Sequence, residues 1–321
     1  MKNKLSDNTS TLQQVSYTSL SPTMALQLAA PHTWPAAILP VFLGVACAVQ
    51  LTGQVSFTLS MALLVICILM QAAVNTINDY YDFIKGTDSI ENQDDPTDAV
   101  LVYNNINPRS AFYLALAFLG CALVLGIYVI YSSGWIPLAI GIIGALVILF
   151  YSAGKSPISY LPIGEYISGI TMGGLITLAS FYALTKSFNM IILVISIPII
   201  IGIGLIMFTN NTCDTDKDIA AGRKTQSVLL GHYKAKIAYR ATLLIWLACI
   251  VIMVAVFFTS GLIVIPFMLL ILYPSLKALY NNPLIPKTRG QAMGQCLNIN
   301  IGLGIFYVSA ILFDASGIIV F

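Results

Sequence analysis

Long apolar segments alternate with short polar segments along most of the chain. A helix that crosses a bilayer needs about 20 predominantly apolar residues, and the sequence contains nine segments of roughly that length. They are residues 33–52, 57–82, 110–131, 135–153, 163–184, 189–212, 237–258, 261–281 and 293–319. Strands of a membrane barrel would instead show stretches of about ten residues in which polar and apolar positions alternate. The pattern therefore predicts an all-α, polytopic membrane protein with nine transmembrane helices.

The composition supports this interpretation. Of the 321 residues, 58% are hydrophobic and 9% are charged, and the mean hydropathy is +0.88, whereas about a quarter of the residues of a soluble domain are charged. We therefore expect the lipid bilayer to surround the protein, and we expect no nucleic acid partner. Residues 1–24 begin with a stretch rich in Ser, Thr and Gln and are predicted to form a flexible tail. A single transmembrane domain is predicted over residues 25–321.

The polar breaks between the apolar segments are of two kinds. Those after the first, third, fifth and seventh segments are short, and those after the second, fourth, sixth and eighth are long and charged. All but Lys186 of the 15 Lys and Arg residues lie in or beside the long breaks or in the N-terminal tail. Cytoplasmic loops carry an excess of Lys and Arg. The sequence therefore predicts a multi-pass protein of the cell membrane whose charged face, and any site on it, is cytoplasmic.

A first acidic motif, residues 75–88, directly follows the apolar run from Met61 to Val74. Its polar side chains are Asn75, Asn78, Asp79, Asp82 and Asp88. The first four are spaced i, i+3, i+4 and i+7, so on a helix they share one face. Their oxygen atoms form a group of the hard ligands that divalent cations prefer.

A second acidic motif, residues 210–218, also follows an apolar segment. Its residues Asn211, Asp214 and Asp218 repeat an i, i+3, i+7 spacing found in the first motif. Four predicted crossings separate the motifs, so both lie on the same face. Two clusters of carboxylates repel each other unless a cation lies between them, and Mg²⁺ is usually held by one or two carboxylates together with substrate phosphates. The pair of motifs predicts a Mg²⁺–diphosphate site.

Three basic residues near the motifs are candidates for binding the diphosphate. They are Lys155, Arg223 and Lys224. Each also has a simpler explanation, because the positive-inside tendency alone places basic residues in these loops. Asp314, an ionisable residue inside the last apolar segment, is a functional candidate by default, but its position near the outer end favours an exposed interfacial residue.

At these motifs the sequence resembles the UbiA superfamily of intramembrane aromatic prenyltransferases. The matching stretches are Asn78-Asp79-Tyr80-Tyr81-Asp82 with Lys85-Gly86-Thr87-Asp88, Asn210-Asn211 with Asp214 to Asp218, Ala221-Gly222-Arg223-Lys224-Thr225, and Leu229-Leu230-Gly231. The resemblance covers nearly all of residues 25–320 and is closest to the branch that prenylates 1,4-dihydroxy-2-naphthoate for menaquinone biosynthesis. The chain departs from that branch at Ala30, where Arg is common, and in the stretch from Asp95 to Asn107. The resemblance implies nine helices around a central cavity.

The implied reaction is a Mg²⁺-dependent transfer of a polyprenyl group from its diphosphate to an aromatic acceptor. The expected metal ligands are Asn78, Asp82, Asp214 and Asp218. The expected catalytic residues are Asp79, Asp82, Asp214, Asp218, Lys155 and Tyr151, and the expected cofactor-binding residues are Asn75, Asn78, Asn211, Arg223, Lys224 and Asp88. The ring of Tyr151 would shield the allylic cation that forms when the C–O bond of the donor breaks.

Two kinds of alternative remain open from the sequence. The acceptor could be 4-hydroxybenzoate, homogentisate, a chlorophyllide, haem or a glycerol-phosphate lipid. A protein of another class, a cation transporter with an acidic ion path, would also carry acids in membrane helices. Transport sites usually lie near the bilayer midplane, whereas both acidic motifs here lie at the ends of apolar segments, and this placement favours the enzyme.

Overall fold

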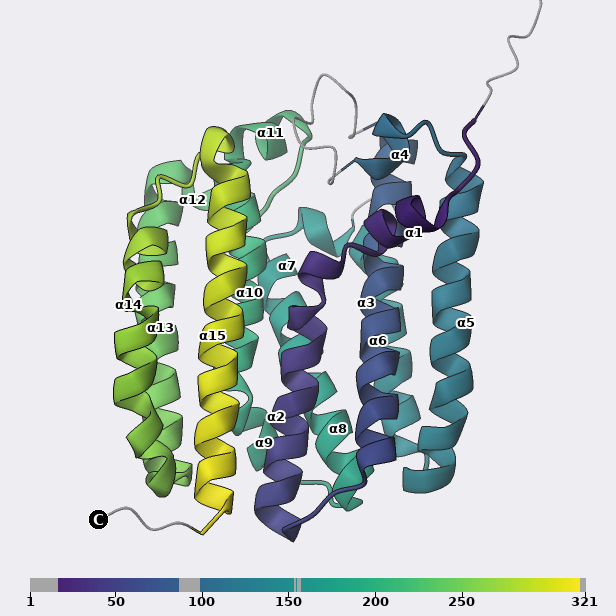
Figure 1. Ribbon diagram of the computed structural model, residues 1–321. Coiled ribbons are helices and arrows are strands. Elements are labelled where there is room, and N and C mark those ends of the chain that lie inside the picture. The colour runs from purple at the N-terminus through teal and green to yellow at the C-terminus, as the bar shows by residue number, and fades with distance from the viewer. Residues whose placement is uncertain (1–16, 87–98, 153, 155–156, 318–321) are drawn as a thin grey trace, which may run out of the picture.

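The protein is a bundle of long helices that lie side by side, with several short helices at one end (Figure 1). The computed structural model describes residues 17–317 apart from 87–98, 153, 155 and 156. The first half contains α1 (Pro22–Ala29), the 3-10 helix η1 (Pro31–Thr33), α2 (Pro35–Thr52), α3 (Phe57–Lys85), α4 (Val100–Tyr103), α5 (Pro108–Ser133) and α6 (Ile136–Ser152). The middle contains the 3-10 helix η2 (Ile158–Tyr160), α7 (Gly164–Ser168), the π-helix η3 (Gly169–Leu175), α8 (Ile176–Thr185), α9 (Ile191–Ile195), α10 (Ile197–Cys213) and α11 (Thr215–Ala220). The last part contains α12 (Gln226–Leu230), α13 (His232–Phe257), the 3-10 helix η4 (Thr259–Ile263), α14 (Val264–Asn281), the 3-10 helix η5 (Pro286–Thr288) and α15 (Arg289–Ala315).

Seven helical stretches of the described chain are long and apolar enough to cross a membrane. They are Pro35–Thr52, Phe57–Lys85, Pro108–Ser133, Gly164–Thr185, His232–Phe257, Thr259–Asn281 and Pro286–Ala315. Two shorter apolar helices, α6 and α10, occupy the other two predicted segments. The all-α, multi-pass architecture is confirmed, whereas spanning length is reached by seven of the nine predicted helices.

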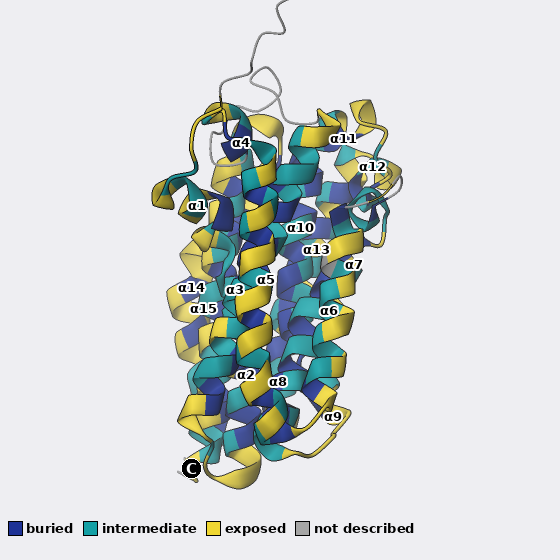
Figure 2. Cartoon of the chain, turned by 90° about the vertical axis from the view of Figure 1, so that its right-hand side faces the viewer, coloured by how far each residue is buried: buried dark blue, intermediate teal, exposed yellow. Residues whose placement is uncertain are grey.

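The outward faces of the bundle are apolar, as expected for helices that contact lipid. Exposed positions run along the outer sides of α5 and α6 (Figure 2). On α5 these positions include Leu116, Leu123, Val124 and Ile127, all of which are exposed. The large apolar core lies on the inner faces of α2, α10, α13 and α15.

The predicted N-terminal tail is shorter than the sequence suggested. Residues 17–24 were assigned to a flexible tail, but Thr18 forms a bridge with Ile106 and its backbone N–H donates to Asn105 at 2.9 Å. Ser21 caps α1 by accepting from the N–H of Met24, and Pro22 occupies the first turn, where its missing N–H costs nothing. The segment therefore folds against residues 99–111 in a small apolar cluster of its own.

Asp314 has a structural explanation at the opposite end of the bundle. One carboxylate oxygen accepts from the backbone N–H of Ser260 at 2.8 Å, and the other accepts from the side chain of Gln50 at 2.8 Å. The residue thus ties the end of α15 to η4 and to the end of α2. The carboxylate of Asp314 therefore stabilises a contact between three segments.

Glycine allows helices to approach closely on the inside of the bundle. A Cβ atom at Gly44 on α2 would lie 2.7 Å from the Cβ of Ser180 and 2.8 Å from the carbonyl oxygen of Thr177 on α8. Gly173 on η3 is as close to the backbone of Ile200 on α10. Small residues serve this purpose in membrane helix packing, where van der Waals contact replaces the hydrophobic driving force.

We expect Gly44→Ala to destabilise the protein by about 1–3 kcal/mol, because the added methyl group overlaps backbone and side-chain atoms of α8. Gly120→Ala on α5 is the matched control, since none of the described atoms lies within 4 Å of a Cβ built there. Alanine should be neutral or stabilising by about 0.5–1 kcal/mol at that exposed helical position. Thermal unfolding in detergent measures both changes. Equal melting temperatures for the two variants would contradict the packing described for α2 and α8.

Candidate active site

The first acidic motif lies at the C-terminal end of α3, and its side chains divide between two environments. Asp82 is partly exposed, with 34% of its side-chain surface accessible. The oxygen of Asn78 accepts a hydrogen bond from the hydroxyl of Ser152 at the end of α6. Asp79 is buried, and its carboxylate accepts from the backbone N–H groups of Val100 at 3.1 Å and Leu101 at 3.4 Å. Asp79 therefore holds the short helix α4 against α3.

The second acidic motif spans the end of α10 and the start of α11. Asn210 lines the cavity described below and accepts two hydrogen bonds from the guanidinium of Arg289, at 2.7 and 2.9 Å. The same guanidinium pairs with Asp214 at 2.8 Å. Asn211 instead is buried and donates to Glu165 at 2.8 Å. The structure thus directs Asn210 toward the cavity and Asn211 away from it.

The helix is not continuous through this motif. The backbone at Asp214 has φ −100° and ψ 19°, which ends α10, and α11 begins at Thr215. The i, i+3, i+7 comparison assumed one unbroken helix from Asn211 to Asp218. Asn210 lies four residues before Asp214, so the two side chains share a helix face and both contact Arg289, whereas the break at Asp214 places Asp218 on the separate helix α11.

The two motifs converge on Arg223. Its guanidinium lies 3.4 Å from a carboxylate oxygen of Asp218 and 3.9 Å from one of Asp82. It also stacks on the ring of Tyr160, with 4.8 Å between the guanidinium carbon and the ring centre. Two helix ends separated by more than a hundred residues in the sequence therefore meet within the span of one side chain. The predicted convergence of the motifs is confirmed.

Burial affects the titration of the second motif. Asp218 is 2% exposed, and this burial raises its pKa to about 6, although Arg223 acts in the opposite direction. Thr225 donates a hydrogen bond to the same carboxylate at 3.2 Å. A second cation near this carboxylate would favour its charged form further.

Lys85 is a further cation beside the Tyr160 ring. It is not among the site residues predicted from the sequence. Its ammonium group donates to the carbonyl oxygen of Ser152 at 2.7 Å and lies 5.1 Å from the ring centre of Tyr160. Arg223 approaches that ring as well. Lys85 follows Asp82 by three residues, so the motif spacing itself could have revealed it.

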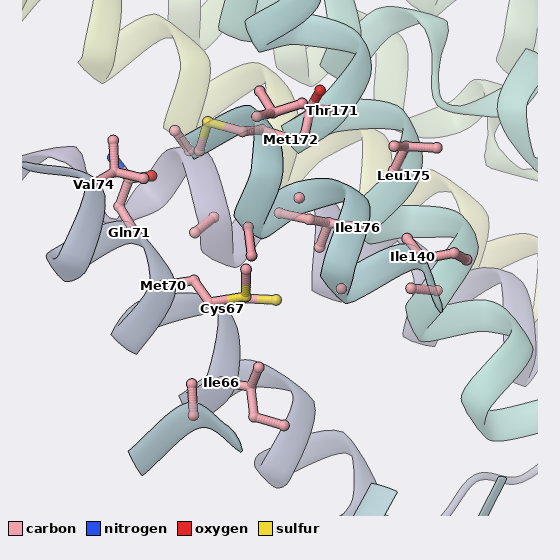
Figure 3. A pocket seen from close by; sticks show the side chains of 18 of the residues that line it. Ile66, Cys67, Met70, Gln71, Val74, Ile140, Thr171, Met172, Leu175 and Ile176 are labelled. Atoms are coloured by element: carbon pink, nitrogen blue, oxygen red, sulfur yellow. The ribbon is translucent and has the colours of Figure 1, made fainter. Parts of the chain in front are cut away.

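Below the motifs lies an apolar cavity of about 550 Å³. Its walls come from α2, α3, α5, α6, η3, α8, α10 and α15, and Figure 3 shows α3 residues such as Cys67 and Met70 facing Met172 and Ile176. The polar lining residues are Thr33, Gln71, Asn75, Asn78, Tyr151, Ser168, Thr171, Ser180 and Asn210. None of the described lining residues carries a charge. Asn78 and Asn210 belong to the acidic motifs, so the polar end of the cavity adjoins the convergent carboxylates.

Several predicted site residues occupy other places. Asn75 lies in the cavity wall, where its amide donates to the carbonyl oxygen of Ala29 at 3.1 Å and to the hydroxyl of Thr33 at 2.8 Å. Tyr151 lines the cavity beside Asn78, and Lys224 is exposed. Lys155 and Asp88 lie outside the described residues, as do the acids of the 94–98 loop.

The donor atoms suit Mg²⁺ better than a metal that needs a closed protein cage. Carboxylate and amide oxygens are hard ligands, and Mg²⁺ commonly takes one or two carboxylates while water and phosphate fill the other positions. Among the described residues no three His, Cys, Asp or Glu side chains are grouped closely enough to hold a metal by themselves. Asp82, Asp214 and Asp218 are instead paired with arginines, so these carboxylates fit an ion that arrives with its substrate.

Comparisons with known proteins agree with this site. A Bacillus subtilis (strain 168) protein named 1,4-dihydroxy-2-naphthoate octaprenyltransferase is 40% identical over 206 residues, which cover 64% of this chain and 65% of that protein. UbiA prenyltransferase domain-containing protein 1 of Danio rerio is 30% identical over 217 residues, which cover 67% of this chain and 63% of the relative. The aligned region thus spans less than two thirds of the length of either relative.

The fold also matches a solved structure. A UbiA homolog from Archaeoglobus fulgidus, bound to GPP and Mg²⁺, aligns with a TM-score of 0.59 at 17% identity and covers 89% of this chain and 99% of that chain. The sequence profile of the UbiA prenyltransferase family matches residues 37–292, which include both acidic motifs and most of the bundle. The chain therefore belongs to the UbiA prenyltransferase family.

Proposed function

We propose that this chain transfers a polyprenyl group from its diphosphate to 1,4-dihydroxy-2-naphthoate in menaquinone biosynthesis. The observation that carries the proposal is the approach of Asp82 and Asp218 to one guanidinium, directly beside an apolar cavity. Such a site suits a ligand with an anionic head and a hydrocarbon tail. The name of the Bacillus subtilis relative supports the acceptor, and the GPP and Mg²⁺ bound to the Archaeoglobus homolog support the donor and the ion.

In this proposal Asn78, Asp82, Asp214 and Asp218 hold Mg²⁺. When bound, the ion supplies positive charge that neutralises the diphosphate as the C–O bond breaks. The residues of the first motif come from α3 and those of the second from α10 and α11. Only their convergence allows one diphosphate to contact both.

The cations of the site act on the leaving diphosphate. Arg223, already placed between Asp82 and Asp218, would bind its oxygens, and Lys85 lies close enough to the same Tyr160 ring to join it. Lys224 is a further exposed cation beside Arg223. From the sequence, Lys155 is also assigned to the diphosphate and Asp88 to the cofactor-binding residues.

The remaining predicted residues support the site rather than contact the diphosphate. Asp79 accepts a backbone hydrogen bond from α4, and the side-chain amides of Asn75 and Asn211 donate hydrogen bonds to neighbouring segments. Tyr151 lines the polar end of the cavity, where its ring would face the allylic cation. The aromatic acceptor would attack this cation from the cavity, and its ring carboxylate would leave as CO₂.

The proposal places the acidic motifs on the cytoplasmic side of the cell membrane. The distribution of Lys and Arg supports this orientation, because Lys186 alone of the 15 basic residues lies in a break of the other kind. The cation-transporter alternative has less support. The described residues that line the cavity are uncharged, and the acids lie at helix ends above it. The other aromatic and lipid acceptors remain alternatives within the same reaction type.

The metal ligands provide the first test. Asp82→Asn and Asp218→Asn should each lower the rate of prenyl transfer roughly 100-fold or more, because the diphosphate would then meet less positive charge in the transition state. Chelation of Mg²⁺ in the wild type should have the same effect, and added Mg²⁺ should restore the rate. The measurement is the release of pyrophosphate together with formation of the prenylated naphthalene-1,4-diol. Asp216→Asn, an exposed acid of α11, is the control and should keep its activity. Substantial activity in the Asp82/Asp218 double variant would exclude the proposed metal site.

Arg289 provides a second test, because it orients Asp214 and Asn210 without being placed on the substrate. Arg289→Met should raise the Mg²⁺ concentration needed for half-maximal activity by about 10- to 100-fold, as expected when a residue that orients a metal ligand is lost. Arg289→Lys should recover part of the effect, since Lys keeps the charge but not the two-pronged geometry. Lys287→Met, an exposed cation two residues earlier, is the matched control. If Arg289→Met changed the maximal rate but left the Mg²⁺ dependence unaltered, Arg289 would not act through Asp214.

A further inference from the structure

Three neutral side chains form a hydrogen-bond network in the cavity wall below the first acidic motif. They are Gln71 and Asn75 on α3 and Thr33 on η1. The amide nitrogen of Gln71 lies 3.2 Å from the hydroxyl oxygen of Thr33 and 3.4 Å from the side-chain oxygen of Asn75. The amide nitrogen of Asn75 lies 2.8 Å from the same hydroxyl. All three residues line the cavity.

Two backbone carbonyl groups fix the direction of every hydrogen bond in this network. The hydroxyl of Thr33 donates its only hydrogen to the carbonyl oxygen of Ala30 at 2.9 Å, so this hydroxyl can only accept from the two amides. Asn75 must present its nitrogen to the carbonyl oxygen of Ala29, because a carbonyl cannot donate. The side-chain oxygen of Asn75 therefore faces Gln71.

These directions determine the orientation of the Gln71 side-chain amide. Both of its neighbours in the network present acceptor oxygens, so Gln71 must turn its nitrogen toward them and its oxygen away. Reversing the amide would place oxygen against oxygen at both contacts. The freed oxygen has no hydrogen-bond donor among the described residues, although the side chain is nine-tenths buried at 8% exposure. An acceptor in such a place is normally satisfied by a ligand or by water.

The depth of Gln71 indicates which part of a substrate it meets. Gln71 precedes Asn78 by seven residues on α3, which places it about 10 Å deeper in the bundle at 1.5 Å per residue. A diphosphate held at the end of α3 would leave the reacting carbon between these two levels. Figure 3 shows Gln71 on the α3 wall of the cavity, above Met70 and Cys67. The group that meets Gln71 therefore belongs to the acceptor ring.

We propose that the side-chain oxygen of Gln71 accepts a hydrogen bond from a phenolic hydroxyl of the aromatic acceptor. Asn75 and Thr33 are positioning residues that fix the orientation of the Gln71 amide. This inference rests on the proposed prenyl transfer and specifies how the acceptor is recognised. A hydroxyl supplies the donor that the site needs, whereas a carboxylate would be repelled by the oxygen of Gln71.

The interaction also has a chemical consequence for the ring. A hydroxyl that donates to a good acceptor carries more negative charge on its oxygen, which increases the electron density of the aromatic system. That density is what attacks the allylic cation. Gln71 therefore both places the ring and favours its reaction, without itself accepting the proton.

The test compares Gln71→Met with the wild type in acceptor kinetics. Met is unbranched and similar in size but lacks the amide oxygen. The KM for 1,4-dihydroxy-2-naphthoate should rise about tenfold, which corresponds to the loss of one hydrogen bond to a buried group, while the KM for the prenyl diphosphate should stay within about twofold. Gln27→Met, the same substitution at an exposed residue of α1 outside the cavity lining, is the matched control and should change neither constant.

A second measurement uses acceptor analogues that lack one hydroxyl each, 1-hydroxy-2-naphthoate and 4-hydroxy-2-naphthoate, as competitive inhibitors. In the wild type one of them should bind about tenfold more weakly than the other, because it lacks the hydroxyl that meets Gln71. In Gln71→Met this difference in affinity should disappear, because neither analogue can then donate to the residue 71 side chain. A merely structural change would instead weaken both analogues equally and preserve the difference. The wild-type comparison needs no variant, so equal affinities for the two analogues would overturn the inference even where Gln71→Met fails to fold.

The outcomes separate this inference from the proposed function. A wild-type protein that prenylates no aromatic acceptor overturns the proposed function itself. An active wild type with equal affinity for the two analogues, or a Gln71→Met variant with an unchanged acceptor KM, overturns the role of Gln71 alone. A variant that loses affinity for donor and acceptor alike shows that Gln71 supports the fold and does not bind the acceptor.

Discussion

The approach of carboxylates from two distant helix ends to one shared cation is the interaction on which this site depends. Asp82 and Asp218 would repel each other in a setting where burial already disfavours charge, and Arg223 lies between them at 3.9 and 3.4 Å. The arrangement links the end of α3 to the start of α11 without requiring direct packing between these helices. It also defines a place where charge must be balanced. A metal–diphosphate pair can enter there because it supplies both the cation for the carboxylates and the anion for the arginine.

The residues around this centre show that an acidic motif does more than bind metal. Asp79 receives two backbone N–H groups of α4, and Asn211 holds Glu165 at the start of α7. Arg289 reaches from the start of α15 to Asp214. These contacts join the segments that surround the mouth of the cavity, and buried polar groups of this kind are costly unless each one has a partner. The motif thus carries both the proposed ligands and part of the framework that would orient them.

The sequence was sufficient to predict the helices and the meeting of the two motifs, because hydrophobic periodicity reports burial directly and an even number of crossings returns the chain to the same face. It was not sufficient to distinguish Asn210 from Asn211. That choice depends on contacts between distant segments, because Arg289 donates to Asn210 whereas Glu165 accepts from Asn211. Arg289 and Glu165 were also missed as site residues, since their importance arises from contacts between segments that lie far apart in the sequence. The folding of residues 17–24 was missed for the same reason, because their partners are residues 99–111.

The polar end of the cavity illustrates why neutral groups suit this chemistry. A fixed carboxylate beside a forming allylic cation would hold the cation in place and compete with the acceptor ring, and a fixed ammonium would oppose its formation. The described cavity lining avoids both, since its polar members are amides and hydroxyls together with Tyr151. Amides can still impose orientation, because a network anchored on the carbonyl oxygens of Ala29 and Ala30 has only one consistent direction. In the proposed reaction the charged groups are thereby confined to the end from which the diphosphate would leave, and the reacting carbon would lie among neutral polar groups of fixed orientation.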